Sequence, residues 1–263
     1  MTEKVKEPYT IILGAEGGLG REIARQVAGK KCNLILVSTT SIDLQRFAIG
    51  LQLKEEVQVE ACRLKLSDHD SIRRFSEEVR DKYEIRALIN NIACDWTTGG
   101  RQSIGELAGE DFMTRFRGTA LLTWSLLSHM TALSSSYIQH IIPFPFRKEQ
   151  ITPEMKQSAS KMYAFARELE EELKPTSISV SIVHPAPLRS TEELSTPAES
   201  PVRREPELAP SMVALKAVNG MLRGDRLIIP GFRNRVQFFL NRQATGWFRS
   251  TRESLETNLQ PSV

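Results

Sequence analysis

Three glycines, Gly14, Gly18 and Gly20, follow the apolar residues 11–13 at the spacing G-x-x-x-G-x-G, and an amphipathic stretch covers residues 19–28. The pattern predicts a strand, a tight turn and a helix. Glycine lets a backbone come close to a pyrophosphate, and the first turn of a helix offers N–H donors at the positive end of its dipole. The spacing therefore predicts a dinucleotide cradle; a turn kept only for helix–strand packing is the alternative.

Strand-like and helix-like segments alternate along the chain, about thirty residues per repeat. The expected strands after the first lie at residues 33–38, 57–66, 86–89, 137–142, 178–183 and 226–229, and the later helices at 41–54, 67–83, 109–133, 153–173 and 207–222. This alternation is typical of a parallel sheet with right-handed crossovers. We expect an α/β fold, a Rossmann-like three-layer sandwich with a seven-stranded parallel sheet and helices on both faces.

Composition narrows the function classes. The chain has 263 residues, of which 40% are hydrophobic and 25% charged, so we expect a single domain over residues 1–263. The net charge of +3 gives no reason to expect nucleic acid. Three cysteines without a C-x-x-C pair and four histidines predict no metal site and no disulfide framework. No apolar run of about eighteen residues occurs, so we expect a cytoplasmic protein without a transmembrane segment.

Two segments depart from this regular texture. Residues 185–210 contain six of the thirteen prolines, which predicts a mobile lid or loop at the carboxyl edge of the sheet. Residues 231–263 form a basic aromatic C-terminal extension, with five arginines and no acid in 231–252. Such a segment can lie on a membrane surface or bind an acidic partner. The interpretation we favour is a helix that packs its aromatic side chains on the domain or on a second subunit.

Several landmarks together resemble the short-chain dehydrogenase/reductase family over nearly the whole chain. Asn90-Asn91 resembles the family's N-N-A-G, Ser158-Ala159-Ser160-Lys161 resembles its Y-S-A-S-K helix, and residues 184–190 are similar to its P-G-P-V-x-T segment. The resemblance implies an NAD(P)-dependent oxidoreductase fold. It also implies a homodimer or homotetramer that pairs through helices 109–133 and 153–173, or a hetero-oligomer with an active relative.

The family's chemistry uses a tyrosine, a lysine four residues later, a serine and an asparagine. In this chain Gln157 stands at the tyrosine position, Phe144 lies where the serine is expected, and Arg115 matches the asparagine. Of the four catalytic positions only Lys161 survives. Carbonyl reduction needs a group that can give up a proton near neutral pH, which an amide cannot do. The resemblance therefore implies that ordinary carbonyl reduction has been lost.

The cofactor-binding positions that the resemblance implies are only partly conventional. Glu16 in the turn would repel a 2′-phosphate, which gives a weak bias toward NAD and leaves both NADP and the loss of all binding open. Lys65 stands where an aspartate usually meets adenine, and Ser190 where a threonine meets the carboxamide. The expected cofactor-binding residues are Gly14, Glu16, Gly18, Leu19, Gly20, Thr39, Lys65, Asn90, Asn91, Lys161 and Ser190.

Three functional hypotheses follow. The first is a pseudoenzyme of this family with a nucleotide-binding, sensing or scaffolding role. The second is an active NAD(P)-dependent oxidoreductase with an unconventional proton donor, such as Lys161, His140 or water. The third is an interaction module that acts through its C-terminal basic segment. His140 and His184, which end two expected strands, are interpreted as structural residues.

Overall fold

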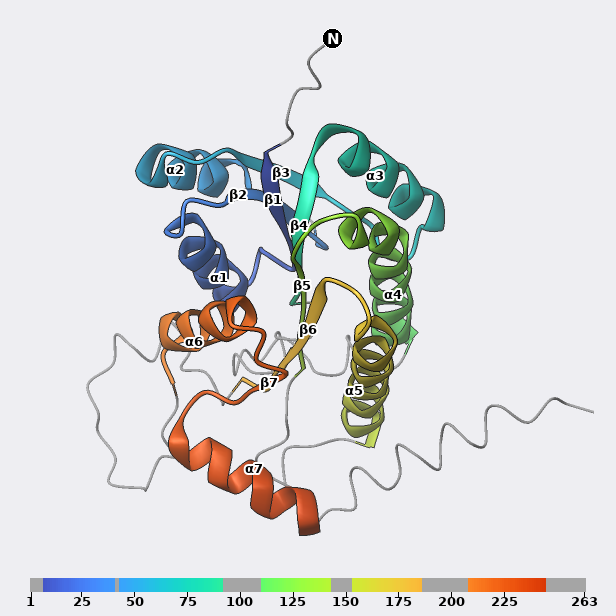
Figure 1. The fold of residues 1–263 in the computed structure, drawn as a ribbon. Coiled ribbons are helices and arrows are strands. Elements are labelled where there is room, and N and C mark those ends of the chain that lie inside the picture. The colour runs from blue at the N-terminus through green and yellow to red at the C-terminus, as the bar shows by residue number, and fades with distance from the viewer. Residues whose placement is uncertain (1–6, 41–42, 92–109, 143–152, 186–207, 245–263) are drawn as a thin grey trace, which may run out of the picture.

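The computed structural model describes residues 7–40, 43–91, 110–142, 153–185 and 208–244 (Figure 1). Seven strands form one sheet in the order β3-β2-β1-β4-β5-β6-β7, and every neighbouring pair is parallel. The strands are β1 (Pro8–Leu13), β2 (Asn33–Ser38), β3 (Val59–Arg63), β4 (Glu84–Asn90), β5 (Ser136–Ile141), β6 (Ile178–Val183) and β7 (Leu227–Ile228). The predicted seven-stranded parallel sheet is confirmed.

Helices cover both faces of the sheet, as the sequence predicted (Figure 1). One face packs against α1 (Gly18–Ala28), α2 (Gln45–Glu55) and α6 (Pro210–Leu222). The other packs against α3 (His69–Lys82), α4 (Glu110–Thr131) and α5 (Pro153–Leu173). A further helix, α7 (Phe232–Ala244), follows β7. Residues 186–207, which make up most of the expected lid, and residues 245–263 of the C-terminal extension lie outside the described residues.

Local chemistry sets the helix starts. Asp68 caps α3, because its Oδ1 accepts hydrogen bonds from the backbone N–H groups of Asp70 (3.0 Å) and Ser71 (3.2 Å). The helix expected over residues 41–54 begins later than the sequence predicted. Asp43 lies outside the helix, and its Oδ1 accepts from the N–H of Gln45 at 2.9 Å, so the helix begins at Gln45.

Helix α4 packs directly on the chain that leaves β3. A Cβ added to Gly118 would stand 2.2 Å from the carbonyl oxygen of Leu66 and 2.8 Å from its Cβ. No real side chain tolerates that distance to a backbone atom, so any larger residue here forces the helix away from the sheet.

Helix α7 is held on the domain by an aromatic stack. The buried ring of Phe238 lies 5.1 Å from the ring of His184, which directly follows β6, and Tyr163 from α5 stacks on the same imidazole at 5.8 Å. His184 Nδ1 donates to the carbonyl oxygen of Ile142 at 2.8 Å. Tyr163 is thus a packing residue of α5.

Burial keeps this imidazole neutral. Loss of hydration lowers the pKa of His184 to about 4, and the hydrogen bond to Ile142 opposes that shift only in part. Because the unfolded chain takes up a proton near the ordinary histidine pKa and the folded chain does not, His184 adds stability above pH ~6.5 that is lost as the pH falls toward the folded value.

Gly118→Ala should lower the free energy of unfolding by about 2 to 3 kcal/mol, because α4 must shift to admit the methyl group. Urea denaturation followed by circular dichroism measures the change. Gly50→Ala in α2 is the matched control, since nothing lies within 4 Å of its added Cβ, and it should be neutral or stabilising. Equal effects of the two substitutions would contradict the close contact at Leu66.

His184→Phe should reduce the dependence of the unfolding free energy on pH by about 1.4 kcal/mol per pH unit between roughly pH 6 and 5. The phenyl ring keeps the stack but removes the proton uptake in the unfolded state. Urea titrations at several pH values measure the slope, with His69→Gln at the exposed start of α3 as the control. A slope that stays unchanged in His184→Phe would show that the native imidazole titrates normally.

Candidate functional site

The glycine turn lies at the point where the strand order reverses. Strand β1 pairs with β2 on one side and with β4 on the other, and the chain leaves β1 toward β2 but leaves β4 toward β5, in opposite directions along the sheet. In open α/β sheets this reversal opens a crevice at the carboxyl ends of the strands, where ligands bind. The turn is therefore in the position that its predicted phosphate role requires.

The physical environment of the backbone differs at each of the three glycines of the turn. Gly14 has a φ of +75°, a conformation that side chains disfavour. A Cβ on Gly20 would lie 2.2 Å from the Gly14 carbonyl oxygen, so this glycine is needed for packing α1 on the turn. A Cβ on Gly18 would meet nothing within 4 Å. Gly14 and Gly20 thus serve the turn itself. At Gly18, by contrast, the described residues leave open space beside the backbone.

Among the described residues, no side chain caps the start of α1. Its N-cap residue is Gly17, no side chain caps the helix, and its first turn holds no acidic residue. Leu19 is buried in the core, so only its backbone is available at the turn. The first N–H groups and the positive end of the helix dipole are left for an anion.

Glu16 reaches from the turn to the end of β2. Its Oε1 accepts hydrogen bonds from the backbone N–H of Thr39 at 2.9 Å and from the Thr39 hydroxyl at 2.8 Å. The second oxygen, Oε2, is buried and has no hydrogen-bond partner among the described residues. The sequence offered no reason to connect Glu16 with Thr39, and the structure joins them by two hydrogen bonds. The Oε2 atom of Glu16 remains as an additional acceptor.

Asn91 ties the end of β4 to the glycine turn. Its Nδ2 donates to the Gly14 carbonyl oxygen at 2.9 Å, and its backbone N–H donates to Leu13 at 3.0 Å. The Nδ2 atom also stands 3.0 Å from the place of a Cβ on Gly20. Asn91 is thus a structural hydrogen-bond hub of the turn.

Asn90 points into a buried polar cluster beneath the site. Its Nδ2 lies 3.3 Å from His140 Nδ1 and 3.4 Å from the Thr123 hydroxyl. Desolvation lowers the pKa of His140 to about 4, so the ring is neutral at pH 7. A group with that pKa is poorly matched to proton transfer near neutrality. Sequence reasoning missed Thr123, because nothing in its neighbourhood distinguishes it from other helical threonines.

The residues expected at the reacting end lie on separate helices. Gln157 and Lys161 are one turn apart on α5, with Lys161 exposed, and Arg115 is half-buried on α4. Lys65 is exposed in the turn after β3, where its carbonyl oxygen accepts from the N–H of Asp68 at 3.1 Å. Phe144 and Ser190 lie outside the described residues.

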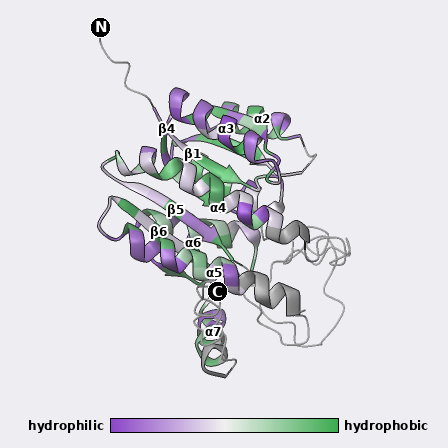
Figure 2. Ribbon diagram, turned by 90° about the vertical axis from the view of Figure 1, so that its right-hand side faces the viewer, coloured by the Kyte–Doolittle hydropathy of each residue, from purple (hydrophilic) through white to green (hydrophobic). Residues whose placement is uncertain are grey.

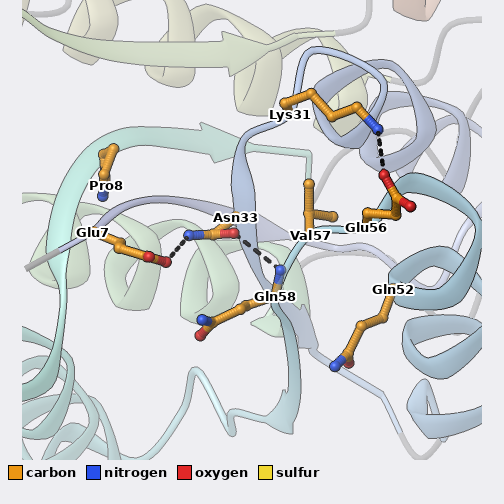
Figure 3. Close-up of a pocket in the computed structure, with 8 residues that line it drawn as sticks. All are labelled: Glu7, Pro8, Lys31, Asn33, Gln52, Glu56, Val57 and Gln58. Carbon is orange, nitrogen blue, oxygen red and sulfur yellow. Dashed lines mark hydrogen bonds and ion pairs between the residues drawn. The ribbon is translucent and has the colours of Figure 1, made fainter.

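A second, open pocket lies at the opposite, amino edge of the sheet, around the starts of β1 and β2 (Figure 3). Its polar groups already pair with one another. Asn33 Nδ2 donates to Glu7 at 2.8 Å, Asn33 Oδ1 accepts from the N–H of Gln58 at 2.9 Å, and Lys31 lies 3.9 Å from Glu56. This pocket therefore offers no free chemistry comparable with that of the glycine turn.

Within the described residues, no group of three or more histidine, cysteine, aspartate or glutamate side chains could hold a metal ion. Over the same residues, no helix is long and apolar enough to cross a membrane.

Two curated relatives cover most of the chain. Retinol dehydrogenase 12 of Homo sapiens is 26% identical over 197 residues, and the very-long-chain 3-oxoacyl-CoA reductase of Kluyveromyces lactis is 27% identical over 237 residues. These alignments cover 68% and 79% of this chain, and each covers 61% of the relative. The chain thus spans less than two thirds of the length of the relatives that it matches.

Solved structures share the fold. A bulky-bulky ketone specific alcohol dehydrogenase from Comamonas testosteroni matches with a TM-score of 0.71 and 18% identity, covering 98% of this chain and 97% of that one. A short-chain dehydrogenase from Sphingobium yanoikuyae in complex with NADPH matches with a TM-score of 0.67 and 20% identity, covering 97% of this chain and 98% of that one.

The family model described as short chain dehydrogenase matches residues 9–199. The matched region runs from β1, through the glycine turn, Asn90 and Asn91, and on past helix α5 and strand β6. The sheet order, the turn at the strand reversal and this match agree, and the protein belongs to the short-chain dehydrogenase/reductase family, a family of NAD(P)-binding oxidoreductases.

Proposed function

We propose that this protein binds a nicotinamide dinucleotide at the glycine turn, prefers NAD to NADP, and does not carry out ordinary carbonyl reduction. It acts as a nucleotide-responsive sensing or scaffolding pseudoenzyme. The proposal of nucleotide binding rests on the open space at Gly18, which lies beside the uncapped start of α1. A cytoplasmic location and a homo-oligomeric state stay predictions.

The residues of the turn fit the nucleotide. The backbone N–H groups at the start of α1 would hold the pyrophosphate, and a side chain at Gly18 would fill the space needed for it. The unpartnered Oε2 of Glu16 would accept a hydrogen bond from a ribose hydroxyl. A 2′-phosphate beside that carboxylate would bring two negative charges together, which supports the preference for NAD.

The residues of the reacting end do not support ordinary reduction. A bound nicotinamide would supply hydride transfer, and the protein would have to deliver the proton. The amide of Gln157 is not an acid, and burial holds the pKa of His140 at about 4. Lys161 can still bind ribose hydroxyls, a role that needs no proton transfer.

Gly18→Val should weaken NADH binding about tenfold or more, because the side chain occupies the open space of the cradle. Isothermal titration calorimetry measures the affinity. Gly50→Ala, on an open face of α2, is the control and should leave binding unchanged. A thermal melt distinguishes weaker binding from loss of stability. We expect the melting temperature to stay unchanged, because nothing lies within 4 Å of a Cβ added at Gly18.

The catalytic half is tested with a panel of ketones, aldehydes and 3-oxoacyl thioesters, monitoring NADH and NADPH absorbance. We expect binding without substrate-dependent oxidation. Turnover by the unaltered chain would favour the active oxidoreductase with an unconventional proton donor. If no nucleotide binds at millimolar concentration, the glycine turn serves packing alone, and the proposal fails.

Glu16→Gln should shift nucleotide preference toward NADPH, lowering the ratio of the NADPH to the NADH dissociation constant about tenfold. The amide can still accept from Thr39 but no longer repels a 2′-phosphate. Glu22→Gln is the matched control, because Glu22 lies on α1, which follows the turn, and pairs with Arg25 on the outer surface of that helix. An unchanged ratio in Glu16→Gln would mean that the carboxylate does not face the ribose.

A further inference from the structure

Helix α7 contacts the domain on one side only. Phe238 and Asn234 are 0% and 6% exposed, and Asn234 Nδ2 donates to the Pro230 carbonyl oxygen at 3.0 Å. Four large apolar side chains of the same helix are exposed instead. They are Phe232 (80%), Val236 (43%), Phe239 (50%) and Leu240 (65%), and we call them the outer apolar face.

The outer apolar face points away from the domain. At about 100° per residue, its four members span an arc of about 100°. The centre of that arc lies about 180° from the buried pair Phe238 and Asn234. Figures 1 and 2 show α7 outside both helical layers, projecting from the body of the domain.

Positive charge borders this face on both sides. Arg233 and Arg235 are exposed and lie on opposite flanks of the arc by the same helical geometry. The helix contains no acidic residue from Phe232 to Ala244. A helix with an apolar stripe between two cationic flanks can lie along an anionic membrane surface. Its apolar side chains then lie at the boundary of the acyl chains, and its guanidinium groups lie at the lipid phosphates.

The charges also argue against a second copy of the chain as the occupant. Two such helices paired through the outer apolar face would bring arginine flanks together, and α7 offers no carboxylate to pair with them. Like charges at this spacing destabilise a helix pair. An anionic lipid surface supplies both the apolar phase and the negative charge that the face lacks.

We propose that α7 is a membrane-surface helix that docks this protein on anionic lipid through the outer apolar face. The stack of Phe238 on His184 makes the helix a rigid part of the domain, so docking orients the whole molecule. Because His184 directly follows β6, the docked surface lies beside the carboxyl edge of the sheet. The inference uses no residue of the glycine turn and is independent of the proposed nucleotide binding.

The test is flotation of the full chain with vesicles of phosphatidylcholine alone or with a quarter of phosphatidylserine. We expect binding only to the vesicles with phosphatidylserine, weakening as salt is raised. Phe239→Ser combined with Leu240→Ser should reduce partitioning about tenfold or more. Arg233→Gln combined with Arg235→Gln should reduce it roughly thirtyfold.

Matched controls separate this surface from general stickiness. Ile49→Ser with Leu53→Ser removes two apolar side chains of similar exposure from α2, and Arg46→Gln with Arg74→Gln removes two exposed charges elsewhere. Both controls should bind as the unaltered chain does. Circular dichroism and thermal melts verify that all variants are folded, which is expected because the substituted side chains are exposed.

Three results would overturn the proposal. The first is no flotation of the unaltered chain with anionic vesicles. The second is equal binding by the Phe239 and Leu240 variant, which would assign the contact to another segment. The third is a lower native mass for the Phe239 and Leu240 variant than for the unaltered chain, measured by light scattering, when neither protein binds vesicles. That result would assign the face to a second copy of the chain.

Discussion

The close packing of the α1 start on the turn after β1 is the constraint on which this molecule depends. Gly14 takes a backbone conformation that other residues disfavour, Gly20 leaves no space for a Cβ, and the amide of Asn91 fastens the turn to the end of β4. These contacts join the neighbouring strands β1 and β4 at the place where the strand order reverses. They also hold the start of α1 at the carboxyl edge of the sheet, so the packing that stabilises the fold also positions the proposed anion site.

Polar groups of opposite character meet around this crevice. The start of α1 offers donors without a side-chain cap, and Glu16 offers a buried acceptor at the end of β2. A ligand with an anionic centre and a hydroxyl-bearing end satisfies both. The neutral His140, in the buried polar cluster beneath the site, provides polarity without an acid that works at pH 7. The electrostatics therefore support recognition of a nucleotide better than they support proton transfer to a substrate.

The aromatic stack at His184 connects the sheet to the C-terminal helix. Tyr163 and Phe238 both stack on the imidazole, and the carbonyl oxygen of Ile142 accepts a hydrogen bond from it, so α5, β6, α7 and the residue after β5 meet at His184. The buried side of α7 packs on the domain, and large apolar side chains are exposed on the opposite side. One helix thus packs on the domain and carries the proposed membrane-docking surface, because its two sides carry different residues.

The sequence by itself determined the sheet, the helices of both layers and the position of the turn, because these depend on local periodicity and glycine spacing. Only the tertiary structure decided which glycine is open, how Glu16 meets Thr39 across the crevice, and which side of α7 is buried. Those contacts join residues far apart in the chain, such as Gly14 with Asn91. Side-chain packing, which no local pattern encodes, determines them.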